Sequence, residues 1–193
     1  LMIANGAIAE LSDVSVRESG HLGLAAFGAR TQVTINRGSI SGTEYGPGIW
    51  VRDGAVTEIS NVLLDDNALF GVLASGAETE LTVEAARVSA TRQEVSEISE
   101  ISEVESAGSI EVIEDADADA VTEVAEIEER SLSSFMAGIA MANGARASIS
   151  KSTVVGNARA AILVTGSESE VSIVDTRLMG LSTVAEIEVL EEG

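Results

Sequence analysis

A glycine signal that recurs along the chain constrains its fold more than any other feature of the sequence. Six glycines occupy equivalent positions, at spacings of 22, 26, 22, 68 and 22 residues, and an aliphatic residue follows each glycine after five residues. A second short apolar segment precedes each glycine. Repetition of this kind indicates a solenoid, in which each repeat buries its apolar face against its neighbours. The glycines are Gly6, Gly28, Gly54, Gly76, Gly144 and Gly166.

The repeats alternate between two kinds, so the repeating object is a pair of rungs. In the odd repeats the inward candidates lie five and three residues before the glycine, whereas in the even repeats they lie four and two residues before it. After the glycine, an aliphatic position follows ten residues on in the odd repeats and twelve residues on in the even repeats. Because a one-residue slip turns a strand inside out, these shifts predict two different turns. The undisturbed copy of this pair runs from Gly6 to Gly54.

The apolar alternation is typical of short strands and not of helices, because it has period two over three to five residues. Hydrophobic residues make up 45% of the chain but aromatic residues only 3%, so the core must be aliphatic. We expect residues five after the glycines to form one column inside the coil, with neighbours about 4.8 Å apart. This expected column contains Ile59, Leu81, Ile149 and Val171.

One turn slot carries asparagine. Asn67 and Asn157 stand thirteen residues after their glycines, and Ser19 occupies the same slot in the first repeat. Asparagine tolerates left-handed backbone, and its amide can bond to a neighbouring turn. We therefore predict a structural ladder at this slot, with a ligand-binding role as the alternative.

Two segments of the sequence are similar to each other, and together they carry a resemblance to a known family. Residues 48–55 read Gly-Ile-Trp-Val-Arg-Asp-Gly-Ala, and residues 138–145 read Gly-Ile-Ala-Met-Ala-Asn-Gly-Ala; the returns at 59–62 and 149–152 are also alike. In these features the chain resembles the right-handed parallel β-helix repeat family, the pectin-lyase-like solenoids. The resemblance implies an all-β coil and an extracellular or cell-surface location. It leaves the activity open, since lyases, hydrolases, adhesins and scaffolds share the fold.

An acidic segment interrupts the repeats and divides the chain into residues 1–92, 93–137 and 138–193. Fourteen acids and one base lie between Glu94 and Arg130. Within it apolar residues recur every three positions, a period that fits neither a strand nor an α-helix well. The alternatives are a loose helix, a turn-rich loop, disorder, or one degraded rung around 108–137. We expect deletion of residues 94–130 to leave the fold intact. The apolar positions are Val95, Ile98, Ile101 and Val104.

Segments that depart from the repeat pattern all occur at one position, just after the last aliphatic residue of an even repeat. The acidic segment leaves after Val88, residues 42–47 fill the same slot in the first pair, and an acidic stretch over 184–192 follows Leu178. Insertions confined to one face of a solenoid often mark its binding face. Because the chain begins inside a rung and shows no capping helix at either end, we expect flanking rungs or end-to-end stacking on a partner.

The acidic segment contains a spacing that is compatible with calcium. Its carboxylates fall at positions 1, 3, 5, 9 and 12 of a calcium-loop frame, where alternate oxygens can converge on a hard cation. The frame has Ala120 where a glycine is needed for the sharp turn, and Thr122 at the usual aliphatic position. An ordinary solvated acidic run is the alternative, with no cofactor at all. The residues are Asp115, Asp117, Asp119, Glu123 and Glu126.

Two carboxylates and two aromatic residues complete the candidate site residues. Asp65 and Asp66 form an Asp pair on a predicted turn. Glycoside hydrolysis needs two carboxyl groups on opposite sides of the scissile bond, and the sequence shows no further carboxylate that would face this pair. We expect them to be outward turn residues and assign no catalytic residue. Trp50 should point outward between Ile49 and Val51, and with Tyr45 it forms a candidate platform for a sugar ring or a partner protein. The alternative is local packing beneath the loop at 46–47.

Charge and composition exclude several functions. The net charge of −21 disfavours nucleic-acid and anionic membrane partners, and no apolar run is long enough to span a bilayer. The absence of cysteine excludes disulfides and zinc–thiolate sites. The sequence therefore favours a non-catalytic β-helix segment of a larger exported or surface protein, a scaffold or a module that binds glycan or protein. The alternative is a polysaccharide lyase or glycoside hydrolase of the same fold.

Overall fold

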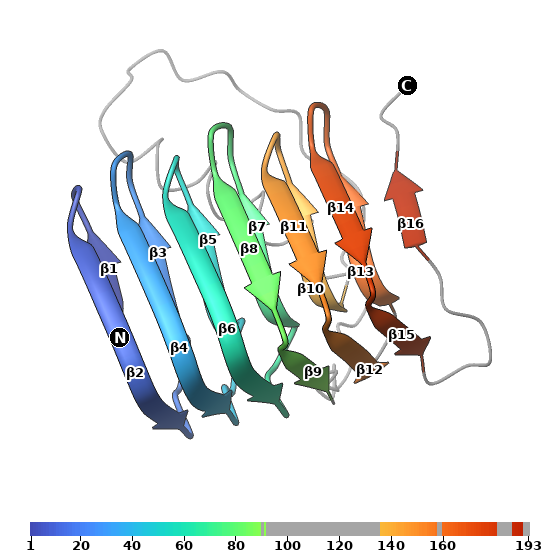
Figure 1. The fold of residues 1–193 in the computed structure, drawn as a ribbon, viewed down its shortest axis with the longest axis horizontal. Coiled ribbons are helices and arrows are strands. Elements are labelled where there is room, and N and C mark those ends of the chain that lie inside the picture. The colour runs from blue at the N-terminus through green and yellow to red at the C-terminus, as the bar shows by residue number, and fades with distance from the viewer. Residues whose placement is uncertain (90, 92–135, 158–159, 181–186, 191–193) are drawn as a thin grey trace, which may run out of the picture.

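The computed structural model describes residues 1–89, 91, 136–157, 160–180 and 187–190, which form a coil of parallel strands, a β-helix (Figure 1). One wall is a seven-stranded parallel sheet, here called the first sheet, in the order β1-β3-β5-β7-β10-β13-β16. Its strands are β1 (Met2–Ala4), β3 (Leu24–Phe27), β5 (Ile49–Arg52), β7 (Phe70–Ser75), β10 (Ala137–Ala142), β13 (Ala160–Thr165) and β16 (Ile187–Leu190).

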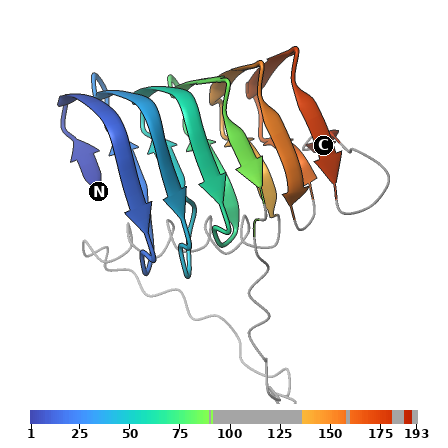
Figure 2. The same cartoon turned by 60° about the horizontal axis from the view of Figure 1, so that its bottom comes forward.

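The second sheet bends, so that it supplies the other two walls of the coil (Figure 2). In the first three rungs one long strand makes both walls: β2 (Ile8–Arg17), β4 (Gln32–Ser41) and β6 (Val56–Asp65). In the later rungs the strand is divided at the bend into β8 (Glu80–Glu84) and β9 (Arg87–Ser89), β11 (Arg146–Ser150) and β12 (Thr153–Asn157), and β14 (Glu170–Val174) and β15 (Arg177–Gly180). The bend residue has a positive φ in each described rung: Asp13, Arg37, Asn61, Ala85, Lys151 and Asp175.

The interior is filled by aliphatic columns, as the composition requires, but their register differs from the expected one. Ile59 and Ile149 do share a column, because each is paired with Val83. Leu81 instead pairs with Thr57 and Ala147, and Val171 pairs with Ala147, so these two belong to the neighbouring column. The expectation of a single column was wrong. The complete column, here called the inner column, contains Leu11, Ile35, Ile59, Val83, Ile149 and Ile173.

The cause is the two turn types that the shifted patterns predict. In the odd rungs the chain turns on Asn-Gly or Asp-Gly, with positive φ at both residues, as at Asp53 (57°) and Gly54 (78°). This is the geometry that such dipeptides favour, since glycine adopts it without steric cost. In the even rungs the turn has one more residue and the glycine comes first in it, for example from Gly76 through Glu78, at φ 60°, to Thr79, so the next strand begins two residues further from the glycine than in the odd rungs. The residue five positions after the glycine therefore belongs to one column in the odd rungs and to the neighbouring column in the even rungs.

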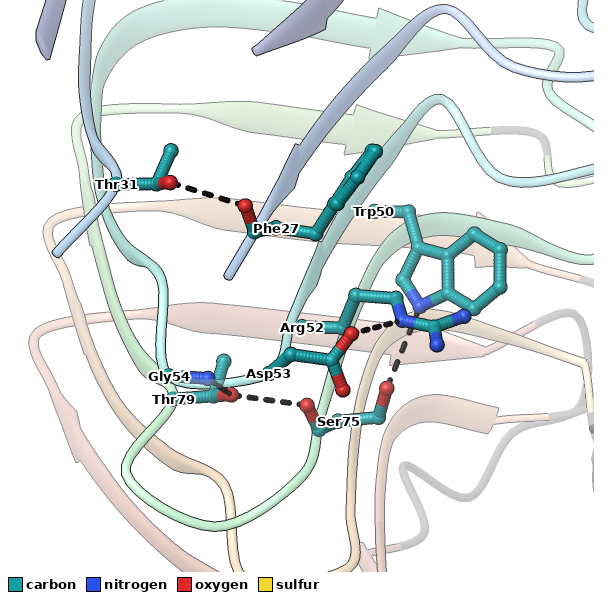
Figure 3. A network of polar contacts seen from close by, with 8 residues as sticks. All are labelled: Phe27, Thr31, Trp50, Arg52, Asp53, Gly54, Ser75 and Thr79. Atoms are coloured by element: carbon teal, nitrogen blue, oxygen red, sulfur yellow. Dashed lines mark hydrogen bonds and ion pairs between the residues drawn. The ribbon is translucent and has the colours of Figure 1, made fainter. Parts of the chain in front are cut away.

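A hydroxyl holds each odd rung to the even rung that follows it. Thr79 Oγ1 accepts a hydrogen bond from the backbone N–H of Gly54 at 3.1 Å and donates to the carbonyl of Ser75 at 2.9 Å (Figure 3). Thr79 is fully buried, and its two partners, Gly54 and Ser75, are half-buried. The same pair of bonds is made by Thr31 in the first pair of rungs and by Ser169 in the third. We call this arrangement the hydroxyl staple.

The long connections fall between stapled pairs. Residues 42–48 join β4 to β5, and residues 90–136 join β9 to β10. On either side of the acidic segment the coil is continuous, because Val72 pairs directly with Ile139 in the first sheet. No rung therefore lies between β7 and β10; the predicted degraded rung itself falls on residues outside those described, apart from 136–137, and Ala137 opens β10.

The acidic C-terminal stretch includes a strand of the coil. Ile187 pairs with Ile162, so β16 extends the first sheet by one strand. The sequence spacing between these two isoleucines equals that between Leu24 and Ile49, which are also paired. Residues 181–186 and 191–193 lie outside the described part.

The asparagine slot forms a ladder in which asparagine alternates with threonine. Asn67 is fully buried; its Oδ1 accepts from the N–H of Thr43 at 3.4 Å, and its Nδ2 donates to the carbonyl of Ile40 at 3.1 Å. Asn157 Oδ1 likewise accepts from the N–H of Thr91 at 3.5 Å. Both asparagines thus bond to the preceding even rung. Gly138 leaves room here, since a Cβ on it would lie 2.6 Å from Asn157 Nδ2.

Candidate functional site

Trp50 lies on the outer face of the first sheet, as expected from its position between two inward residues. Ile49 and Val51 on either side are fully buried in the core, so the indole projects outward from β5. Its Nε1–H donates to Ser75 Oγ at 3.3 Å, and the guanidinium carbon of Arg52 lies 4.9 Å from the ring centroid (Figure 3). A cation over an indole face is attracted by the ring quadrupole. Trp50 is therefore half-buried and engaged in local packing.

Tyr45 has a different partner, the single histidine of the chain. The rings of Tyr45 and His21 have centroids 5.6 Å apart and are tilted by 40°. The N–H of Tyr45 donates to the carbonyl of Gly20 at 3.0 Å, which holds together the two loops that precede β3 and β5. Both rings are exposed, Tyr45 by 56%. We call these two residues the aromatic pair.

The predicted platform of Tyr45 and Trp50 thus consists of two separate sets of contacts. The sequence patterns did not single out His21 as a partner of Tyr45. The signal was present in the rung period: the sequence separation of His21 and Tyr45 equals that of the paired strand residues Gln32 and Val56. Loop residues at that spacing stack as strand residues do.

A second apolar cluster lies outside the coil, on the outer face of the first sheet. Register places Trp50, Leu73, Ala140 and Leu163 in one outward column. The alternation of inward aliphatic residues does not predict it, because that pattern concerns the inward positions alone. We call it the outer cluster: Phe70, Leu73, Ala137, Ala140, Ala160 and Leu163, with Trp50 and Leu69 packed at its margin.

The candidate carboxylates lie at the end of β6, away from the aromatic pair in sequence. Asp65 Oδ1 accepts a hydrogen bond from Ser89 Oγ at 2.6 Å, and Asp66 has a positive φ of 54°, as expected for a turn. Within the described ranges no three His, Asp or Glu side chains are grouped so that they could hold a metal ion. The calcium-frame residues, from Asp115 to Glu126, fall outside the described residues.

Charged side chains form ion pairs at the bend of the second sheet. Arg37 donates to both oxygens of Asp13, at 2.8 and 2.9 Å, and Lys151 Nζ lies 2.7 Å from Glu84 Oε1. These hydrogen bonds lower the pKa of Asp13 and of Glu84 and raise the pKa of Arg37 and of Lys151. The pairs are exposed and join adjacent rungs, so they belong to the surface of the coil and not to a buried site.

Comparison with known proteins agrees with this geometry. The sequence model of the family described as right handed beta helix region matches residues 1–178. The chain belongs to this family. No curated protein and no solved structure matches the chain. The family match establishes a right-handed β-helix repeat fold for this chain and assigns it no specific function. In the described residues there is no helix that could cross a membrane.

Proposed function

We propose that this β-helix is a non-catalytic scaffold and binding module of an exported or surface protein, and that the aromatic pair binds a neutral glycan. The observation that carries the proposal is the exposed contact between Tyr45 and His21, in the loops that precede β3 and β5. The coil supplies a rigid support, because the loops that carry the two rings are bonded to each other through their backbones. The exported location rests on the family resemblance.

The chemistry of the aromatic pair suits a sugar. An aromatic ring offers an apolar face to the C–H groups of a pyranose, while the phenol hydroxyl and the imidazole supply hydrogen bonds at its edge. Glu44, next to Tyr45, adds an exposed carboxylate that can accept hydrogen bonds from sugar hydroxyls. The net charge of −21 opposes the approach of uronic-acid polymers. The favoured ligand is therefore an uncharged oligosaccharide.

Calorimetric titration with neutral and uronic-acid oligosaccharides tests this proposal. We expect neutral glycans to bind, and Tyr45→Ala to weaken binding at least about tenfold, which is about 1.4 kcal/mol. Leu63→Ala is the matched control, because Leu63 is an exposed hydrophobic residue on the second sheet, 39% exposed, and should leave binding unchanged. Absence of glycan binding, or equal loss in both variants, would contradict the proposal.

Chromatography of the glycans after incubation separates binding from turnover. Recovery of unchanged oligosaccharides is the expected result for a binding module. Appearance of shorter products would instead favour the alternative, a lyase or hydrolase of the same fold, and would direct attention to the carboxylates of Asp65 and Asp66.

A further inference from the structure

The turns of the described odd rungs are built on two kinds of dipeptide. Asn5-Gly6 and Asn143-Gly144 carry an asparagine, and Asp53-Gly54 carries an aspartate in the same place. The backbone is alike in all three: φ is 59° and 76° in the first turn, 57° and 78° in the second, and 54° and 83° in the third. In the third turn the N–H of Ala145 donates to the carbonyl of Ala142 at 3.2 Å. Positive φ at both central residues together with this bond is the type I′ turn.

An Asn-Gly dipeptide has a reaction of its own, which is deamidation. The main-chain nitrogen of the glycine gives its proton to hydroxide or another base from solvent and attacks Cγ of the asparagine. The bond from Cγ to the side-chain nitrogen breaks, ammonia leaves with a proton from water, and a succinimide ring remains. Water then opens the ring at either carbonyl, which yields aspartate or isoaspartate. Glycine favours the attack because it has no Cβ to obstruct it. Asn5 and Asn143 are both exposed, so solvent reaches the two side-chain amides.

The turn holds the attacking nitrogen away from its target. In left-handed backbone ψ is about +47°, which places the nitrogen of the next residue on the opposite side of the Cα–C bond from Cβ. Ring closure therefore requires rotation about the Cα–C bond of the asparagine. This rotation takes the asparagine out of the left-handed region, so the turn must open before the ring can form.

The hydroxyl staple holds the same nitrogen. The N–H of Gly6 donates to Thr31 Oγ1 at 3.0 Å, and the N–H of Gly144 donates to Ser169 Oγ at 3.0 Å. Each hydroxyl donates its own proton to a main-chain carbonyl, at 2.9 and 2.8 Å, so it serves the glycine as an acceptor. Figure 3 shows the equivalent arrangement in the second pair of rungs. The reacting nitrogen is thus bonded to the next rung, and it must leave this acceptor before it can lose its proton and attack.

The second turn shows that the fold accommodates one product of the reaction. Asp53 occupies the position of Asn5 and Asn143 with the same left-handed backbone. Its Oδ2 accepts from Arg52 Nε at 2.7 Å (Figure 3). An alanine precedes each of the two asparagines, so a new carboxylate there has no arginine beside it in the sequence. Isoaspartate differs more, because it adds a methylene group to the main chain and so disturbs the register between paired strands.

We infer that Asn5 and Asn143 are sites of spontaneous deamidation, and that the hydroxyl staple on the following rung controls the rate at each site. While the staple is formed the asparagine persists, and when the staple opens the turn can close the succinimide ring. Each staple joins one odd rung to one even rung, so its opening is a local event. The inference does not rest on glycan binding, since none of these groups belongs to the aromatic pair.

Peptide mapping by mass spectrometry measures deamidation at each asparagine separately after incubation of the whole chain in mildly alkaline buffer. Thr31→Val removes the acceptor at the first turn and keeps the shape of the side chain. We expect deamidation at Asn5 to become at least about tenfold faster while Asn143 keeps its rate, since the loss of such a bond shifts a local equilibrium by about this factor. Ser169→Ala should give the reverse pattern. Each turn is therefore the control for the other within one chain.

Conservative variants separate the hydrogen bond from packing. Thr31→Ser and Ser169→Thr keep a hydroxyl in place and should leave deamidation slow at both asparagines. Unchanged rates in Thr31→Val and Ser169→Ala would overturn the inference. Equal acceleration at both asparagines in either variant would overturn it as well, because the controlling event would then be unfolding of the whole coil. So would acceleration by Thr31→Ser equal to that by Thr31→Val.

The unaltered chain provides a test that does not depend on any variant. In a concentration of urea that unfolds the coil, at the same pH, both asparagines should deamidate at least about tenfold faster than in the folded chain, because turn and staple are lost together. Equal rates in the folded and unfolded chains would contradict the inference.

Discussion

The inner column and the outer cluster are both apolar, but they differ in how many rungs take part. Every described rung contributes an aliphatic residue to the inner column, from Leu11 to Ile173. The outer column changes along the coil, from exposed Met2 through half-buried Trp50 to buried Leu163. The coil itself thus requires an aliphatic interior, because the inward side chains of each rung are buried by those of the next rung. The outer apolar surface is confined to particular rungs, so the coil itself does not require it.

The largest expected effect concerns the inner column. Ile149→Ala should destabilise the fold by about 2–5 kcal/mol, since it removes a fully buried side chain from between Val83 and Ile173 and leaves a cavity. Denaturant unfolding followed by circular dichroism measures the change. Leu63→Ala, on an exposed position, should shift the free energy of unfolding by no more than about 0.5 kcal/mol. Similar losses in both variants would contradict the assignment of Ile149 to the interior.

The hydroxyl staple should rank second. Thr79→Val leaves the N–H of half-buried Gly54 without its acceptor; an unsatisfied buried polar group costs about 1–3 kcal/mol, so we expect a loss at the lower end of this range. Thr79→Ser should retain most of the stability, because Ser169 makes the same two bonds in the last pair. If serine and valine were equally destabilising, the effect would come from packing and not from the hydrogen bonds.

A buried threonine without a partner should show the opposite sign. Thr57 is fully buried in the column beside the inner column, and its Oγ1 has no hydrogen-bond partner among the described residues. Thr57→Val keeps the shape and should raise the free energy of unfolding by up to about 1 kcal/mol. Thr43→Val is the control, because Thr43 Oγ1 donates to the carbonyl of Gly46, and its loss should destabilise. Destabilisation by Thr57→Val would show that its hydroxyl is used.

The smallest effect is expected at the surface ion pairs. The hydrogen bond from Arg37 lowers the pKa of Asp13, so this pair stabilises the fold fully above the unfolded pKa of Asp, about 3.9, and the contribution is lost as the pH falls through the lower folded pKa. Asp13→Asn should therefore lower the melting temperature slightly at neutral pH and less in acid. A difference that grows on acidification would have the wrong sign.

Much of the fold could be predicted from sequence because glycine turns and inward aliphatic positions leave local signals. The inward positions shift by one residue before the glycine and by two residues after it, and these shifts correctly indicate two turn types. The expected single column was wrong because the two-residue shift also applies to the position five residues after the glycine. Leu81 was therefore placed one column away from its true position. The shift at Val16 and Ile40, which are paired, already contained this information.

The site was less predictable, because it depends on contacts between rungs at outward and loop positions. The contact of His21 with Tyr45 requires knowledge of which loops stack, and the outer cluster requires knowledge of which outward residues are neighbours in the sheet. Trp50 was predicted to point outward from alternation alone. Its engagement with Ser75 and Arg52 could not be read from the chain, since Ser75 lies on the next rung.

Continuity of the coil across the acidic segment can be measured directly by cross-linking. Thr82 pairs with Ser148 although the whole acidic segment separates them in sequence, and both are exposed. Strand neighbours about 4.8 Å apart fall within the range of disulfide Cα separations, about 4.4–6.8 Å, so Thr82→Cys with Ser148→Cys should form a disulfide on mild oxidation. Thr82→Cys with Ser172→Cys, two rungs apart at about 9.6 Å, should not. A bridge in the second variant, or none in the first, would contradict the direct pairing of the rungs on either side of the segment.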